Sequence, residues 1–185
     1  MVAGSILPIT IHNNELFFLF GKENPMENSA KGWSDFGGRV DAGETIYSAA
    51  LREGGEELTG FLGDNRTLRK LIKNNGGTFK LEHNKYHVHL FFLPYDENLP
   101  KYYNQNHDFL WNRMDKTVLN KTKLFEKIEI KWFSFSEMVQ DKNQFRNFYQ
   151  NIVDIFDENK QKIITFAKNK SKLVRKHNKT QKLYS

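Results

Sequence analysis

Residues 38–60 of the chain read GRVDAGETIYSAALREGGEELTG. Thr45 is a candidate N-cap for a helix, because a threonine hydroxyl can accept a hydrogen bond from a main-chain N–H group of the first turn. The apolar side of this helix would consist of Ile46, Ala49, Ala50 and Leu58. The segment therefore predicts one helix that turns an apolar side toward a core and a charged side away from it.

Three glutamates fall on the charged side. Glu53, Glu56 and Glu57 stand at positions i, i+3 and i+4, so their carboxylates project from adjacent places on one face. Like charges at this spacing destabilise a helix by about 0.2–0.5 kcal/mol per pair, and Gly54 and Gly55 each cost roughly 1 kcal/mol relative to alanine. A cation that prefers oxygen ligands, such as Mg²⁺, would offset the repulsion. A solvated surface patch is the alternative, which the three glutamates alone would favour.

The rest of the chain predicts strands before and after this helix. We expect strands at residues 4–11, 15–20, 78–81, 86–93 and 129–135. Residues 33–40 form a short extended stretch broken by Gly37-Gly38. An i, i+3, i+4 apolar pattern predicts a second helix at about 145–168, whereas residues 94–123 read as loop or mixed structure. The predicted fold class is α/β, with a mixed sheet between helices.

The length and charge of the chain fit one domain with a basic end. A chain of 185 residues with 38% hydrophobic side chains is long enough to bury one core. Residues 1–157 carry 19 basic and 21 acidic side chains, whereas residues 158–185 carry nine basic and one acidic. We therefore expect a folded domain over residues 1–167 and a basic, flexible tail over residues 168–185.

The composition also excludes several classes of protein. The chain has no cysteine, which excludes disulfides, thiol catalysis and zinc–thiolate sites. No apolar run approaches the roughly 20 residues of a membrane helix. The N-terminus lacks the basic start and the small-residue cleavage site of a signal peptide. We expect a cytoplasmic protein that does not contact a membrane.

The segment at 38–60 resembles the Nudix box, whose pattern is G-x5-E-x7-R-E-U-x-E-E-x-G-U, where U is an aliphatic residue. The positions that match at the right spacing are Gly38, Glu44, Arg52, Glu53, Glu56 and Glu57. The surroundings are similar too, since Gly21-Lys22-Glu23 and the stretch Trp33 to Gly38 precede the box and a late strand enters Trp132. Asp35 stands where many relatives have a small or apolar residue, and the sequence gives no account of it. The resemblance covers residues 4–138.

The box departs from the pattern at three positions. Gly54 stands where an aliphatic residue is expected and removes a side chain that would face the core. Thr59 and Gly60 stand where a glycine and an aliphatic residue are expected. Because Gly60-Phe61 supplies that pair one residue late, we expect the helix to end one residue later than in the family.

The resemblance implies an α/β/α sandwich with a catalytic loop–helix–loop that uses Mg²⁺, or Mn²⁺ as a substitute. The implied metal ligands are the carboxylates of Glu53, Glu56 and Glu57 and a main-chain carbonyl of Gly37 or Gly38. Arg52 would orient the catalytic Glu53 through a charge-assisted hydrogen bond, and Glu44 would brace the loop–helix–loop. The metal would neutralise a diphosphate and lower the pKa of a water molecule.

The resemblance also points to residues outside the box. In many family members the general base is a glutamate before the last strand, and Glu126 and Glu129 are the candidates to remove the proton of the attacking water. The aromatic side chains that could stack on a nucleobase are Trp33, Tyr86, Tyr102 and Tyr103. Either glutamate could equally be a surface residue, and packing in the core is the commoner role of such rings.

Three functions remain open at this point. The first is a pyrophosphatase-type hydrolase that cleaves a diphosphate linkage in a nucleoside diphosphate derivative by attack of a metal-activated water. The second is an enzyme that removes a cap or pyrophosphate from the 5′ end of RNA and binds RNA phosphates with the basic tail. The third is a catalytically silent binding module, against which the intact carboxylates argue. We favour the first, and we expect a homodimer because family members are often dimers.

Overall fold

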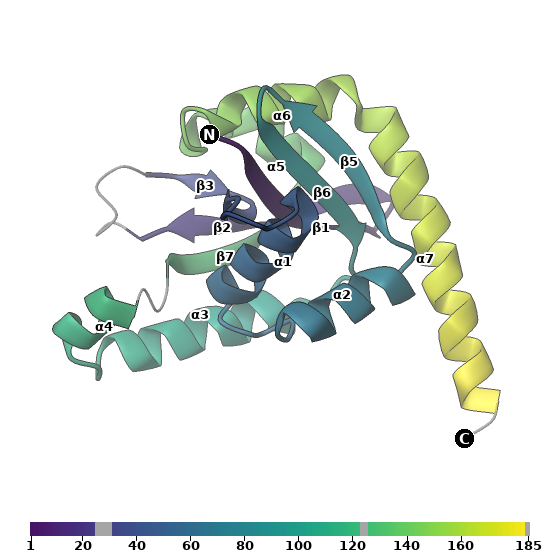
Figure 1. Cartoon of the computed structure of the whole chain (residues 1–185). Helices are drawn as coiled ribbons and strands as arrows, with labels where there is room; N and C mark the ends of the chain where they lie inside the picture. Colours follow the sequence, from purple (N-terminus) through teal and green to yellow (C-terminus); the bar gives the residue numbers. More distant parts are fainter. Residues whose placement is uncertain (25–30, 123–125, 184–185) are drawn as a thin grey trace.

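The computed structural model of the chain describes residues 1–24, 31–122 and 126–183. The strands are β1 (Ala3–His12), β2 (Glu15–Glu23), β3 (Trp33–Ser34), β4 (Phe36–Arg39), β5 (Thr78–His83), β6 (Tyr86–Phe92) and β7 (Lys127–Ser134). Over the described residues they form a seven-stranded sheet in the order β3-β2-β1-β6-β5, with β4 paired to β1 and β7 paired to β2 (Figure 1). The sheet is mixed, because β1 runs parallel to β6 and antiparallel to β2 and β4.

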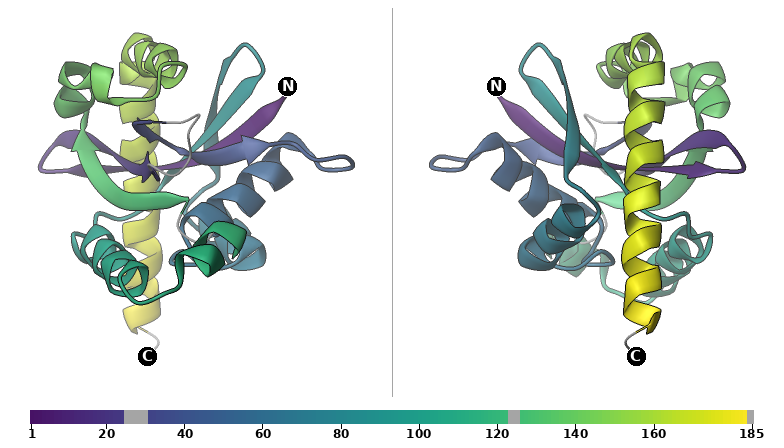
Figure 2. Two further views of the ribbon diagram at one scale, coloured as in Figure 1. Left: turned by 90° about the vertical axis from the view of Figure 1, so that its left-hand side faces the viewer. Right: turned by 90° about the vertical axis from the view of Figure 1, so that its right-hand side faces the viewer.

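Helices cover both faces of this sheet (Figure 2). The first layer contains α1 (Ile46–Glu57), α2 (Asn65–Asn74) and α3 (Asn98–Trp111), and α3 is followed by α4 (Lys116–Thr122). The second layer contains α5 (Phe135–Gln140), the 3-10 turn η1 (Lys142–Gln144), α6 (Tyr149–Glu158) and α7 (Lys160–Leu183). The fold is therefore the α/β/α sandwich that we predicted.

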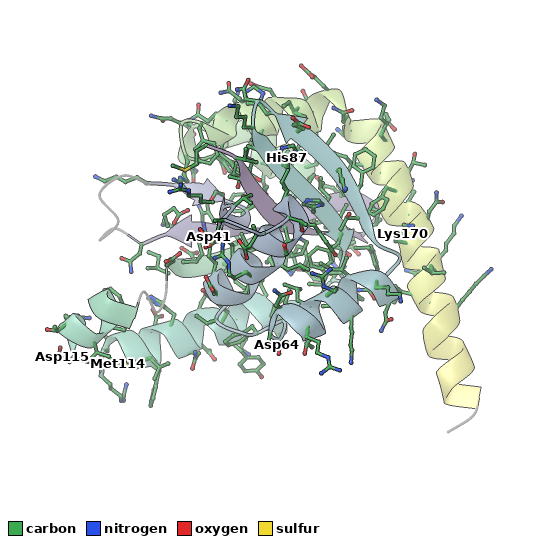
Figure 3. The ribbon with its side chains drawn as sticks, in the orientation of Figure 1. Asp41, Asp64, His87, Met114, Asp115 and Lys170 are labelled. Atoms are coloured by element: carbon green, nitrogen blue, oxygen red, sulfur yellow. The ribbon has the colours of Figure 1, made fainter. Side chains whose placement is uncertain are left out.

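Three helices before β7 were not predicted, namely α2, α3 and α4. α2 begins at Asn65, and the carboxylate of its N-cap Asp64, which Figure 3 labels, accepts a hydrogen bond from the N–H of Thr67 at 2.8 Å. α3 and α4 occupy much of the region 94–123, for which the expectation of loop or mixed structure was wrong for most residues. Pro100 lies in the first turn of α3, where the missing N–H group of proline is tolerated, and it obscured the helical pattern.

The second predicted helix is two helices. α6 ends at Glu158 and α7 begins at Lys160, so the pattern expected to run through residues 145–168 is divided at Asn159. α7 continues to Leu183, and the domain boundary expected at residue 168 falls inside it. Figure 1 shows the C-terminal half of α7 extending beyond the sheet. Flexibility of this segment remains a prediction.

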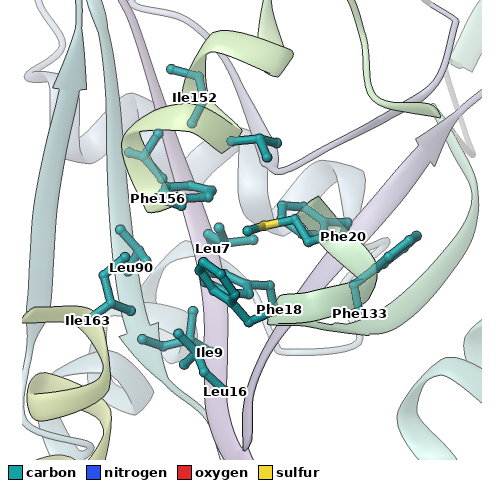
Figure 4. Close-up of a cluster of buried hydrophobic side chains, with 14 of the residues drawn as sticks. Leu7, Ile9, Leu16, Phe18, Phe20, Leu90, Phe133, Ile152, Phe156 and Ile163 are labelled. Atoms are coloured by element: carbon teal, nitrogen blue, oxygen red, sulfur yellow. The ribbon is translucent and has the colours of Figure 1, made fainter. Parts of the chain in front are cut away.

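The strands alternate their side chains between two cores. Leu7 of β1 and Phe18 of β2 pack with Phe156 and Ile163 from the second helical layer (Figure 4). Their neighbours Ile6 and Leu19 face the other way and pack with Leu51, Leu68 and Tyr103 from the first layer. This period of two explains how apolar runs such as residues 16–20 are buried on both sides. Among the described residues, no helix has the length and apolarity of a membrane span.

Candidate active site

The helix α1 has a capped N-terminus and packs closely on the sheet at its middle. Thr45 is its N-cap, as predicted, and the Thr45 hydroxyl accepts a hydrogen bond from the N–H of Ser48 at 3.1 Å. At the middle, a Cβ atom on Gly54 would lie 2.3 Å from Cδ1 of Ile6 in β1. The missing side chain at Gly54 therefore lets α1 pack closely on β1, which accounts for this departure from the box.

The C-terminal end of α1 differs from our expectation. The helix ends at Glu57 with Leu58 as C-cap, so its end is not shifted by a residue. The N–H of Gly60 donates to the carbonyl of Gly55 at 3.0 Å, and the N–H of Thr59 donates to that of Glu56 at 2.9 Å. These two bonds form a Schellman motif, in which Thr59 takes the left-handed position with φ of 48° that usually holds glycine.

Arg52 connects the carboxylates on the outer side of α1. Its Nη1 donates to Oε1 of Glu53 at 2.8 Å, while its Nε and Nη2 each donate to a carboxylate oxygen of Glu44 at 3.0 Å. Asp41 adds an ion pair at 3.4 Å from the loop before α1, where Figure 3 labels it. The hydrogen bond from Arg52 lowers the pKa of Glu44. Arg52 is thus held by Glu44 and in turn holds Glu53.

Glu53 lies against the glycines of β4. A Cβ atom on Gly38 would lie 2.5 Å from the carboxyl carbon of Glu53, so any other residue at this position would displace the carboxylate. The side chain of Glu53 is 16% exposed. Burial raises the pKa of Glu53, and the hydrogen bond from Arg52 acts against this rise. Glu56 is further out, with a 61% exposed side chain whose Oε2 is 3.5 Å from Nη1 of Arg52.

Glu57 turns inward, away from the other two glutamates of the box. The residue is 5% exposed, and its Oε2 accepts a hydrogen bond from the N–H of Gly37 at 2.8 Å. Its Oε1 lies 3.5 Å from Nζ of Lys127. Burial raises the pKa of Glu57 well above its usual value, and the charge of Lys127 opposes that rise. The three carboxylates therefore do not point at one place.

Lys127, at the start of β7, was not identified from the sequence. It is fully buried, and its Nζ donates to Oε1 of Glu23 at 2.5 Å and to Oγ of Ser34 at 2.9 Å. Nη1 of Arg146 donates to the same Glu23 oxygen at 2.8 Å. Burial lowers the pKa of Lys127, but the charges of Glu57 and Glu23 outweigh it and raise the pKa above its usual value. A lysine in a strand gives no sequence signal of burial, because this residue type is almost always exposed.

Asp35 belongs to a second buried polar group next to this one. Its carboxylate accepts hydrogen bonds from the hydroxyls of Ser5, at 2.5 Å, and Tyr86. Burial raises the pKa of Asp35 to about 6, and the two hydroxyls act against this rise. Asp35 therefore ties β1 and β6 to the segment that leads into the box.

The residues present fit a metal that is shared with a substrate. Within the described part of the chain, no three histidine, aspartate or glutamate side chains converge as ligands of one ion. Mg²⁺ is commonly held by one or two carboxylates together with substrate phosphates and water. Glu53, which is partly buried, and Glu56, which is exposed, share Arg52 and leave oxygen atoms for such an ion.

The two candidates for the general base differ in their surroundings. The charge of Glu126 is one of those that raise the pKa of Glu57, so Glu126 acts on the inner end of α1. Glu129 is 40% exposed and lies 3.6 Å from Nζ of Lys22. Glu126 thus acts on a box carboxylate, whereas the contact found for Glu129 is an ion pair with Lys22.

The four aromatic candidates are also in different places. Trp33 is 5% exposed and packs edge-on against Phe133, and Tyr103 is 1% exposed, with its hydroxyl 2.9 Å from the carbonyl of Glu57. Neither ring is open to a ligand. Tyr86 uses its hydroxyl to hold Asp35, and Tyr102 is 55% exposed on α3. Of the four, Tyr102 is the ring most open to solvent.

Comparisons with known proteins identify one family by its family model. The family model described as NUDIX domain matches residues 5–154. A comparison with curated proteins finds no match. A Caenorhabditis elegans Ap4A hydrolase binary complex is 15% identical, with coverage of 89% of this chain and 99% of that chain and a TM-score of 0.49. A mutT/nudix family protein from Listeria innocua is 15% identical, with coverage of 88% and 92% and a TM-score of 0.46.

Proposed function

The chain belongs to the NUDIX family and is a Nudix hydrolase, and we propose that it cleaves a diphosphate linkage in a nucleoside diphosphate derivative with Mg²⁺. The observation that carries the proposal is the outer side of α1. There Nη1 of Arg52 lies 2.8 Å from Oε1 of Glu53, and the carboxylate of Glu53 packs against Gly38. Glu56 remains exposed beside them. Two carboxylates beside a main-chain segment suit an ion that also binds phosphate oxygens.

The metal would be held by Glu53, Glu56 and a main-chain carbonyl of Gly37 or Gly38. When bound, Mg²⁺ neutralises diphosphate charge and lowers the pKa of a water molecule, and Mn²⁺ can do the same. Arg52 keeps Glu53 in one orientation, and Glu44 keeps Arg52 in place through hydrogen bonds of 3.0 Å. This brace lowers the reorganisation needed when substrate arrives.

Glu126 is the better candidate for the general base. It would accept the proton of the attacking water, for which it must be near the carboxylates of α1. Its influence on the pKa of Glu57 supports that position, whereas Glu129 is engaged by Lys22 at 3.6 Å. Replacement of Glu126 by glutamine is therefore the informative variant, with Glu129→Gln for comparison.

The test is hydrolysis of a panel of nucleoside diphosphate derivatives with Mg²⁺ or Mn²⁺, in wild type, Glu53→Gln and Glu56→Gln. We expect each substitution to lower kcat on the order of 10²-fold or more, because the charge that holds the metal is lost. Glu158→Gln is a matched control, since Glu158 is an exposed helical glutamate of α6 on the other layer. Full activity of both box variants, with folds unchanged by circular dichroism, would contradict the proposal.

A further inference from the structure

The ammonium group of Lys127 lies beneath α1, between two buried carboxylates. Its Nζ is 2.5 Å from Oε1 of Glu23 and 3.5 Å from Oε1 of Glu57. The side chain of Lys127 is 1% exposed and those of the two glutamates are 6% exposed, so water screens their attraction only weakly. Glu57 therefore already has a buried positive charge beside it.

The ion pairs at this end of α1 separate into two groups. The ion pairs of the inner group join two carboxylates to two cations: Glu23, Glu57, Lys127 and Arg146. The outer group has four carboxylates and one cation: Asp41, Glu44, Glu53, Glu56 and Arg52. The outer carboxylates thus share one cation among four, whereas Glu57 has Nζ of Lys127 beside it at 3.5 Å, where a divalent cation would be repelled.

Glu57 also makes a contact with β4. Its Oε2 accepts a hydrogen bond from the N–H of Gly37 at 2.8 Å, so Glu57 connects Lys127 to β4. The next residue, Gly38, is the one against which Glu53 packs. Lys127, acting through Glu57, thus fixes the glycine segment beside the outer carboxylates.

We propose that Lys127 is a built-in cation that takes the place of a metal ion at Glu57, and that Glu57 positions Gly37-Gly38 instead of binding the metal. The inference rests on the proposed function and makes Lys127 a positioning residue. The free protein then offers two carboxylates, Glu53 and Glu56, to one divalent ion. Binding of that ion is weak without substrate and tighter with a diphosphate, whose oxygens complete the ligand set.

Measurement of Mn²⁺ binding distinguishes the role of Glu56 from that of Glu57. Substitution by glutamine removes the charge of each side chain and keeps its size. Free Mn²⁺ is measured by electron paramagnetic resonance with wild type, Glu56→Gln and Glu57→Gln, each with and without methylenediphosphonate, a diphosphate analogue that resists hydrolysis. Glu56→Gln removes a proposed ligand and is expected to weaken Mn²⁺ binding by about tenfold or more. Glu57→Gln keeps a side-chain oxygen that can accept the hydrogen bond from the Gly37 N–H, so it is expected to weaken binding by less than about twofold. An equal loss in both variants overturns the inference and leaves the proposed function standing.

A second set of variants tests Lys127 directly. Removal of one partner from a buried ion pair leaves an uncompensated charge, so Lys127→Met is combined with Glu23→Gln and the fold is checked by thermal unfolding. In this double variant Glu57 lacks its cation, and Mn²⁺ affinity is expected to rise by about tenfold; addition of Glu57→Gln should reverse the gain. Unchanged affinity in the folded double variant overturns the inference. If the double variant does not fold, the comparison of Glu56→Gln with Glu57→Gln decides.

The failure of the proposed function itself has a different signature. Wild-type protein that binds no Mn²⁺ with methylenediphosphonate present, and hydrolyses no substrate of the panel, overturns the proposed function together with this inference. A different result overturns the role of Lys127 alone. In that case wild-type protein binds Mn²⁺ with the analogue, and Glu56→Gln and Glu57→Gln weaken this binding equally.

Discussion

The imidazole of His89 is buried on β6 without a hydrogen-bond partner among the described residues. The residue is 3% exposed, and neither ring nitrogen has a donor or acceptor within reach. Tyr47 of α1 faces it with ring centroids 5.0 Å apart, and Lys80 of β5 and His87 of β6 are the charged or titratable groups nearby. Burial lowers the pKa of His89 to about 4, so the folded protein holds this ring neutral.

His89 should make the stability of the protein depend on pH. Between pH 6.5 and 4, His89 is protonated in the unfolded chain and neutral in the folded chain. The folded protein therefore loses stability as the pH falls through this range. When the pH is lowered from 8 to 5, the free energy of unfolding of wild type should fall by about 1–2 kcal/mol more than that of His89→Phe. Urea unfolding of both proteins at the two pH values measures this difference. Parallel pH profiles for the two proteins would contradict the assignment.

The site residues differ in how far sequence could assign them. Glu53 and Glu56 could be identified because the box fixes their spacing on a helix, and the structure places both on its outer side. The spacing of Glu57 is equally clear, but its environment depends on Lys127, which is 70 positions further along the chain. Sequence alone carries no information about such a long-range ion pair. We therefore predicted the same metal-binding role for all three glutamates.

The elements were predictable where local signals were strong. α1 has a cap at Thr45 and a recognisable box, and the predicted strands alternate or form short apolar runs between turn residues. α3 was missed because Pro100 and many polar residues surround only two buried side chains, Tyr103 and His107. Burial of Tyr103 comes from its packing under the end of α1, a tertiary contact with no counterpart in the local pattern.

The end of α1 contains a residue that its backbone does not suit. Thr59 has φ of 48°, a conformation that costs an L-residue about 1–2 kcal/mol, and a β-branched side chain suits it poorly. Thr59→Gly should therefore stabilise the protein by about 0.5–1 kcal/mol, after the greater chain entropy of glycine is subtracted. Thr165→Gly, at an exposed position inside α7, is the control and should destabilise. Chemical unfolding measures both, and a loss of stability in Thr59→Gly would show that the threonine side chain makes a compensating contact.

At the scale of the whole molecule, charge is divided between the domain and the last helix. The first 157 residues carry 19 basic and 21 acidic side chains, whereas residues 158–185 carry nine basic and one acidic. α7 begins packed in the core through Ile163 and Ala167, and then extends past the sheet (Figure 1). Up to residue 176, where the description of its side chains ends, the exposed cations of α7 are Lys162, Lys168, Lys172, Arg175 and Lys176.

Removal of four positive charges from α7 tests whether the substrate is a free nucleotide derivative, as we propose, or RNA. The variant carries glutamine in place of Lys168, Lys172, Arg175 and Lys176. Hydrolysis of free nucleoside diphosphate derivatives should change by less than about twofold, because these substrates carry few phosphates and the proposed ligands lie on α1. The matched control replaces four exposed cations outside α7, namely Arg66, Lys70, Lys85 and Lys101.

Capped RNA supplies the opposing result. A single strand that contacts the four α7 cations would lose about 0.7 in the slope of log K against log salt for each contact removed. If α7 bound RNA, wild type would cleave capped RNA far better than a free nucleoside diphosphate derivative, and only the α7 variant would lose both that preference and the salt dependence. We expect instead that all three proteins cleave capped RNA no faster than a free nucleoside diphosphate derivative, because the proposed ligands lie on α1 and not on α7.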